Sequence, residues 1–169
     1  MSTQTKPQVG IVMGSDSDLD VMKAAADVLQ EFGVDFEITV ASAHRSPQRA
    51  ATWAHTARER GVKVIIAGAG HAAHLAGAMA AHTSLPIIGV PIDSSCLQGL
   101  DALLATVQMP PGIPVATMAL GKPGARNAGI LAVQILALAD KDLTARFEVF
   151  KQDMAVKVEE KAKKLEESL

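Results

Sequence analysis

The sequence predicts an α/β fold in which a doubly wound parallel sheet lies between two layers of helices, a three-layer αβα architecture. Segments typical of strands and of helices alternate five times along the chain. Most of the strands are short apolar runs without polar alternation, as in parallel sheets buried on both faces. With 169 residues, of which 49% are hydrophobic, we expect a single domain over 1–169. Its core spans 8–140, and a helical extension spans 141–169.

Each expected strand is an apolar run between segments rich in glycine or polar residues. The third run is apolar except for Lys63, whereas the second alternates from Phe36 to Val40. Strands are predicted at residues 8–13, 35–41, 62–67, 86–90 and 114–120.

The expected helices carry start and stop signals. In the first, Leu19 to Leu29 have apolar residues at helical spacing, and Gly33 closes the helix. The second begins at Ser46-Pro47, a cap followed by proline at the first helical position, and ends at Gly61. Further helices are predicted up to about His82, near 97–107, and over about 123–139.

The C-terminal extension reads as one long helix with a single apolar stripe. The stripe residues recur every three or four positions, and the rest of the segment is rich in Lys and Glu. Either this stripe packs along the edge of its own domain, or it packs on a neighbouring subunit. We expect the second, because a helix this long extends beyond a compact unit. The stripe comprises Leu143, Phe147, Phe150, Met154, Val158, Ala162 and Leu165.

Composition excludes several classes of function. A net charge of −2 does not indicate a nucleic-acid surface. No apolar run approaches the roughly 20 residues that span a membrane, and the polar N-terminus does not resemble a signal peptide. We therefore expect a cytoplasmic protein. The single cysteine, Cys96, excludes an intrachain disulfide and makes a thiolate metal cluster improbable.

The loop after the first strand has the residues of an anion site. Gly14 permits a tight turn, and Ser15 and Ser17 offer hydroxyls beside helix N-terminal amides, which favour phosphate. Asp18 can accept hydrogen bonds from ribose hydroxyls. Ser and Asp also cap helices in any protein, so this loop alone is weak support.

The loop after the second strand places a histidine beside an arginine. Ser42, Ala43, His44 and Arg45 stand at the carboxyl end of that strand, the edge where open parallel sheets bind ligands. Arginine carries a permanent charge suited to phosphate, and histidine titrates near neutral pH. This pair predicts proton transfer on a phosphorylated substrate.

The loop after the third strand is built of small residues and two histidines. Glycine and alanine over 68–73 let the backbone approach a ligand closely. His71 and His74 are three residues apart, but no Asp, Glu or Cys stands near them with ligand spacing. We therefore expect no metal at this loop.

Together these loops resemble the class I N5-carboxyaminoimidazole ribonucleotide mutase family of purine biosynthesis. The likeness covers about 8–140 and is specific, because several motifs recur in order. The matching segments are 12–18, 42–47, 65–70, 72–75, 86–91, 107–110, 112–117 and 127–132.

The resemblance implies a flavodoxin-like sheet, a homo-octamer, and migration of a carboxyl group from N5 to C4 of an aminoimidazole ribonucleotide. It implies no metal, biotin or nucleotide cofactor. His44 would move the proton as general acid and base, and Asp18 would hold the ribose hydroxyls. Ser15, Ser17 and Arg45 would hold the 5′-phosphate, and Gly14 would belong to the same substrate-binding loop. The pocket for the base and carboxylate would be formed by Ser42, Ala43, Ala69, Gly70, Ala73, His74 and Leu75.

Two positions depart from the family pattern, and two other functions stay open. His71 replaces a glycine and Ala76 replaces a proline in the third loop. One alternative is an aminoimidazole ribonucleotide carboxylase that uses free carbon dioxide, whose third loop is of the Gly-Arg-Ser-Asn type. The other is a non-catalytic flavodoxin-like protein that binds a ribonucleotide or a flavin. A chain with no Tyr and one Trp offers few aromatic groups on which a flavin could stack.

Overall fold

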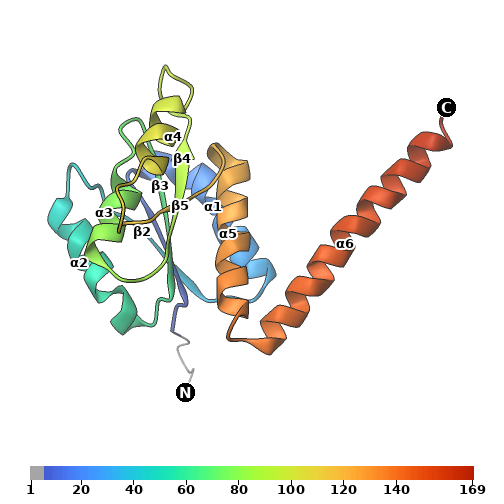
Figure 1. Cartoon of the computed structure of the whole chain (residues 1–169), viewed down its shortest axis with the longest axis horizontal. Coiled ribbons are helices and arrows are strands. Elements are labelled where there is room, and N and C mark those ends of the chain that lie inside the picture. The colour runs from blue at the N-terminus through green and yellow to red at the C-terminus, as the bar shows by residue number, and fades with distance from the viewer. Residues whose placement is uncertain (1–5) are drawn as a thin grey trace.

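A computed structural model describes residues 6–169, and its centre is a parallel sheet (Figure 1). Within those residues the sheet has five strands in the order β2-β1-β3-β4-β5. This order is the flavodoxin-like one, so the predicted doubly wound architecture is confirmed. The strands are β1 (Val9–Met13), β2 (Phe36–Val40), β3 (Val64–Gly70), β4 (Ile87–Ile92) and β5 (Ala116–Thr117).

Helices cover both faces of the sheet, and alternate strand residues point to opposite faces. Ile11 and Ile66 point to one face with α1 and α5, and Val12 and Ile65 point to the other with α2 and α3. Figure 1 shows these two layers on either side of the strands. The helices are α1 (Leu19–Glu31), α2 (Pro47–Arg60), α3 (Leu75–His82), α4 (Leu100–Val107), α5 (Gly121–Ala137) and α6 (Lys141–Glu166), with a 3₁₀ turn η1 (Asp16–Asp18) before α1.

The pairing of α1 with α5 depends on a close backbone approach. A Cβ placed on Gly129 of α5 would lie 2.8 Å from the carbonyl oxygen of Ala25 in α1. Glycine at this position lets the two helices pack directly against each other. Their side chains share one core cluster that covers one face of the sheet.

Several element boundaries differ from the sequence prediction, and three of the differences concern β3, α4 and β5. Strand β3 begins at Val64 and continues to Gly70, because its last residues pair with the end of β4. Helix α4 begins at Leu100, because Gln98 and Gly99 have φ values of 52° and 85° and cannot belong to a right-handed helix. Strand β5 pairs with β4 over only two residues, not over the predicted 114–120.

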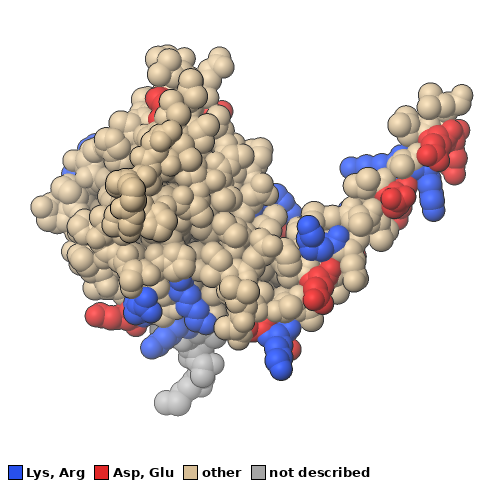
Figure 2. Space-filling model, viewed as in Figure 1, with Lys and Arg blue, Asp and Glu red and all other residues tan. Residues whose placement is uncertain are grey.

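The long C-terminal helix divides into two halves. In the first, Leu143 is buried, and Phe147 and Phe150 lie with ring centroids 6.0 and 5.3 Å from the ring of Phe32. In the second, every side chain from 151 to 169 is exposed. Figures 1 and 2 show this half projecting from the body, with Lys, Asp and Glu along it. Packing on the chain's own domain thus holds for the first half only.

None of the helices within residues 6–169 combines the length and apolar character that crossing a membrane requires.

Candidate functional site

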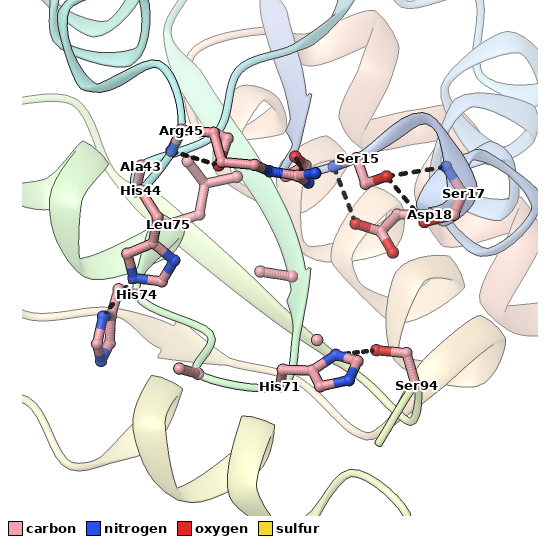
Figure 3. A pocket seen from close by; sticks show the side chains of 15 residues that line it. Ser15, Ser17, Asp18, Ala43, His44, Arg45, His71, His74, Leu75 and Ser94 are labelled. Atoms are coloured by element: carbon pink, nitrogen blue, oxygen red, sulfur yellow. Dashed lines mark hydrogen bonds between the residues drawn. The ribbon is translucent and has the colours of Figure 1, made fainter.

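A cavity of about 320 Å³ lies at the carboxyl edge of the sheet (Figure 3). The loops that follow β1, β2 and β3 meet there, as the sequence predicted from their positions. Parallel strands end at one edge, so segments far apart in the chain converge on one space. The cavity is lined by Gly14, Ser15, Ser17, Asp18, Ser42, Ala43, His44, Arg45, Ala69, Gly70, His71, Ala72, His74, Leu75 and Ser94.

The loop after β1 is held in a capped turn. Ser15 is the N-cap of η1, and its Oγ accepts a hydrogen bond from the Ser17 amide at 3.3 Å. Asp18 completes a capping box by accepting from the Ser15 amide at 3.2 Å. Ser17 Oγ also donates to Ser15 Oγ at 2.9 Å. Hydroxyls and amides are thereby gathered at the start of a helix, where the helix dipole favours an anion.

Asp18 is the buried carboxyl group of the cavity, with 7% of its surface exposed. Burial raises its pKa, since removing a charge from water favours the protonated form. The Ser15 amide and the positive charge of Arg45 act in the opposite direction and lower the pKa less. A carboxyl group placed in this way is suited to accept hydrogen bonds from ligand hydroxyls.

The loop after β2 is closed by serine side chains. Ser46 Oγ accepts from the Ser42 amide at 3.0 Å, and Ser42 Oγ accepts from the Arg45 amide at 3.1 Å. The Arg45 side chain reaches the loop after β1, where it donates to the Gly14 carbonyl at 3.5 Å. Its guanidinium group therefore lies beside the hydroxyls of that loop and adds a positive charge to the anion site (Figure 3).

His44 faces a second histidine. Its Nε2 lies 2.8 Å from Nδ1 of His74, so one of these nitrogens donates a hydrogen bond to the other. The rings meet edge to face with centroids 4.9 Å apart. Both residues are exposed and line the cavity. The sequence had placed these two imidazoles in one pocket, but it did not predict this direct contact between them.

The loop after β3 provides a wall of small side chains. Ala69 and Gly70 end the strand, and Ala72 and Leu75 also line the cavity. Ala73 is 2% exposed and is not among the lining residues, so its place in the pocket stays a prediction. The other twelve predicted substrate and catalytic residues all line the cavity.

Ser94 lines the cavity but was missed in the sequence. Its Oγ is 3.1 Å from Nδ1 of His71. Ser94 stands two residues after the end of β4, so its position at the carboxyl edge of the sheet was a usable signal.

Residues 6–169 contain no group of three or more His, Cys, Asp or Glu side chains placed to share a metal ion. The cavity instead combines hydroxyls and a guanidinium group at one end with paired imidazoles at the other. This arrangement can bind a phosphorylated ligand and transfer a proton to it.

Known proteins share this chain's sequence and its fold. A family model described as AIR carboxylase matches residues 8–157. The N5-carboxyaminoimidazole ribonucleotide mutase of Pyrococcus horikoshii is 59% identical over 162 residues, which are 96% of this chain and 90% of that protein. The Thermotoga maritima protein of the same name is 55% identical over 161 residues, covering 95% of this chain and 93% of the relative.

The fold of this chain is also similar to that of a solved structure. The crystal structure of Treponema denticola PurE superposes with a TM-score of 0.84 at 28% sequence identity, covering 94% of this chain and 98% of that one. The family match extends over the core, the first half of α6 and the beginning of its second half. The chain belongs to the AIR carboxylase family.

Proposed function

We propose that this protein is an N5-carboxyaminoimidazole ribonucleotide mutase, which moves a carboxyl group from N5 to C4 of the aminoimidazole in purine biosynthesis. The observation that carries the proposal is the placement of His44 against His74, 2.8 Å apart, in the same cavity as Arg45, Ser15 and Ser17. One end offers charge and hydroxyls for a 5′-phosphate, and the other offers a proton. The names of close relatives support this assignment.

Binding is assigned by the chemistry of each group. Ser15, Ser17 and Arg45 hold the phosphate, with Gly14 letting the loop turn closely around it. Asp18 accepts hydrogen bonds from ribose hydroxyls. The remaining predicted residues enclose the base and the migrating carboxylate, namely Ser42, Ala43, Ala69, Gly70, Ala73, His74 and Leu75.

His44 is proposed to serve as both acid and base in the reaction. Protonated His44 donates its proton to N5 as the bond between N5 and the carboxyl carbon breaks and carbon dioxide is released. The electron-rich C4 then attacks carbon dioxide, and a new carbon–carbon bond forms. Finally His44 removes the C4 proton, which restores the aromatic ring and the protonated imidazole. His44 regains at C4 the proton that it gave to N5, and the carboxyl group lost from N5 is recovered at C4, so this isomerisation needs no cofactor.

The walls of the cavity support the intermediate step. Released carbon dioxide must stay beside C4, and small apolar walls leave room for it while excluding water. Ala43, Ala69, Gly70, Ala72 and Leu75 form such walls. His74, hydrogen-bonded to His44, fixes the orientation of the catalytic ring.

A turnover assay tests the reaction. The purified protein is mixed with the N5-carboxylated ribonucleotide, and formation of the C4-carboxylated product is followed by ultraviolet absorbance. A parallel reaction supplies aminoimidazole ribonucleotide and bicarbonate. We expect far faster product formation from the N5-carboxylated substrate. Faster formation from the second mixture would instead favour the carboxylase, and no product from either would favour a non-catalytic binding protein.

We also propose that the protein is a homo-oligomer, with an octamer as the expected size. Support comes from the second half of α6, where Met154, Val158 and Leu165 are 39%, 64% and 62% exposed. An apolar stripe in water is unfavourable, and a second copy of the chain would cover it.

Removal of residues 152–169 tests the assembly while keeping the packed half of α6. We expect a smaller mass by light scattering than for the intact chain, with the fold retained by circular dichroism. A second truncation after Ala139 also removes Leu143, Phe147 and Phe150 from the core, so it should lower the thermal midpoint as well. An unchanged mass in the shorter deletion would contradict a role for this segment in assembly.

A further inference from the structure

His71 is held over the cavity in an unusual backbone conformation. Its φ is 52°, in the left-handed region that residues with a Cβ rarely adopt. Its ring Nδ1 lies 3.1 Å from Ser94 Oγ. A strained backbone that persists in a ligand cavity points to a functional constraint.

The contact between His71 and Ser94 depends on the ends of two strands. Gly70 of β3 pairs with Ile92 of β4, which brings the segment after β4 against the third loop. A Cβ on Gly70 would overlap Ser94 Oγ, so the hydroxyl occupies the space that glycine leaves. This arrangement fixes one nitrogen of the imidazole. No group within residues 6–169 is hydrogen-bonded to the other nitrogen, Nε2, which is free to meet a ligand.

The position of His71 relative to the other polar groups indicates which part of a ligand it meets. In Figure 3, His71 and Ser94 lie on the other side of the cavity from Arg45. The side chains proposed to bind phosphate (Ser15, Ser17 and Arg45) and the His44–His74 pair occupy two other regions. Asp18 lies beside Ser15 and Ser17, and a positive charge on His71 across the cavity lowers the pKa of Asp18.

We propose that His71, oriented by Ser94, is a specificity-determining residue that binds a ribose hydroxyl of the substrate together with Asp18. The proposal rests on the proposed function, which makes the substrate a ribonucleotide. A ribose presents two adjacent hydroxyls, each a donor and an acceptor. An ionised carboxylate only accepts, whereas an imidazole nitrogen can donate or accept. The two side chains therefore complement such a pair of hydroxyls, and Ser94 is a positioning residue.

Binding of matched nucleotides separates this role from a structural one. Isothermal titration calorimetry measures the affinity of aminoimidazole ribonucleotide and of its 2′-deoxy and 3′-deoxy analogues. The informative quantity is the preference for the ribonucleotide over each analogue. A misfolded loop weakens all three ligands alike and leaves the preference unchanged.

His71→Gly removes the ring and suits the left-handed backbone, so the loop keeps its path. We expect the preference over at least one deoxy analogue to fall roughly tenfold, the size of one lost hydrogen bond. His71→Asn also tolerates this backbone and keeps a polar group, so it should retain part of the preference. Ser94→Ala should lower the preference, and the neighbouring control Ser95→Ala should not.

An unchanged preference in His71→Gly, in a protein that binds and turns over its ribonucleotide, overturns this inference alone. Wild-type protein that neither binds aminoimidazole ribonucleotide nor turns over the N5-carboxylated substrate overturns the proposed function, and this inference with it.

Discussion

The two ends of the cavity are built differently. At the anion end, Ser15, Ser17 and Asp18 are tied to one another by a capped turn, and Arg45 reaches across to the same loop. At the imidazole end, the rings of His44 and His74 are exposed and hydrogen-bonded to each other. The anion end is fixed before a ligand arrives, whereas the imidazole end stays accessible to the group that reacts.

This contrast suggests a division between binding and chemistry. Interactions with a remote phosphate can orient a substrate without taking part in the bond changes. A general acid and base must instead exchange its proton with the substrate, and so one of its nitrogens must be accessible to the substrate even where the other is held by the protein. The comparison predicts that substitutions at the two ends affect different kinetic constants.

The largest effect is expected at the imidazole end. His44→Asn removes the proton donor, and kcat should fall by about 10²- to 10⁴-fold or more, the usual contribution of a general acid–base residue. Substrate affinity, measured by calorimetry, should stay within a few-fold of wild type. His55→Asn is the matched control, since that ring packs against His82 away from the cavity. If His44→Asn lost affinity as strongly as turnover, the proposed division between a binding end and a reacting end would be wrong.

At the anion end, Arg45→Ala should act mainly on binding. Loss of a charged hydrogen bond to phosphate should raise KM by roughly 10- to 100-fold, with a smaller change in kcat. Steady-state kinetics measure both. Arg49→Ala serves as control, because Arg49 donates to Val40 and Thr39 outside the cavity. A variant with normal KM and low kcat would place Arg45 with the chemistry instead.

The smallest effect is expected at Asp18, the buried carboxyl group of the anion end. Burial raises the pKa of this carboxyl group, so the native state holds its proton more tightly than the unfolded chain does. Its contribution to stability is therefore present at low pH, and it is lost as pH rises from the unfolded pKa of about 4 through the native pKa. Ligand binding has the opposite dependence, because the ionised form is the better acceptor.

Asp18→Asn tests both the pH dependence of stability and the pH dependence of ligand binding. For the variant we expect roughly tenfold weaker ribonucleotide binding at neutral pH. Its affinity should not fall further at acidic pH, whereas the affinity of the wild type should fall as Asp18 becomes protonated. Denaturant titrations should show a flatter dependence of unfolding free energy on acidic pH. Asp20→Asn, on the exposed surface of α1, should behave as wild type in both measurements. Identical pH profiles for wild type and Asp18→Asn would argue against an ionised Asp18 in the complex.

The sequence predicted the parts of the fold that depend on local pattern. Apolar runs located the strands, and signals such as Ser46-Pro47 and Gly61 located the ends of α2. The three loops could be brought to one edge from topology alone, because parallel strands end together. That reasoning was sufficient to place His44, Arg45 and Asp18 in one cavity.

Features set by tertiary contacts were not accessible in the same way. The left-handed Gln98 and Gly99 shorten α4, but the apolar spacing around them still suggests a helix. The contact of His71 with Ser94 depends on the register of β3 against β4. The outward course of α6 depends on where its packing on Phe32 ends, since the apolar stripe continues beyond that point.

Every side chain in the second half of α6 is exposed, so the stability of this segment should depend on protein concentration. Residues 151–166 would form a rod of about 24 Å at 1.5 Å per residue. A helix of this length is only marginally stable in water without a packing surface. In the proposed homo-oligomer, that surface is supplied by another chain, so helix content and thermal midpoint should both rise with protein concentration.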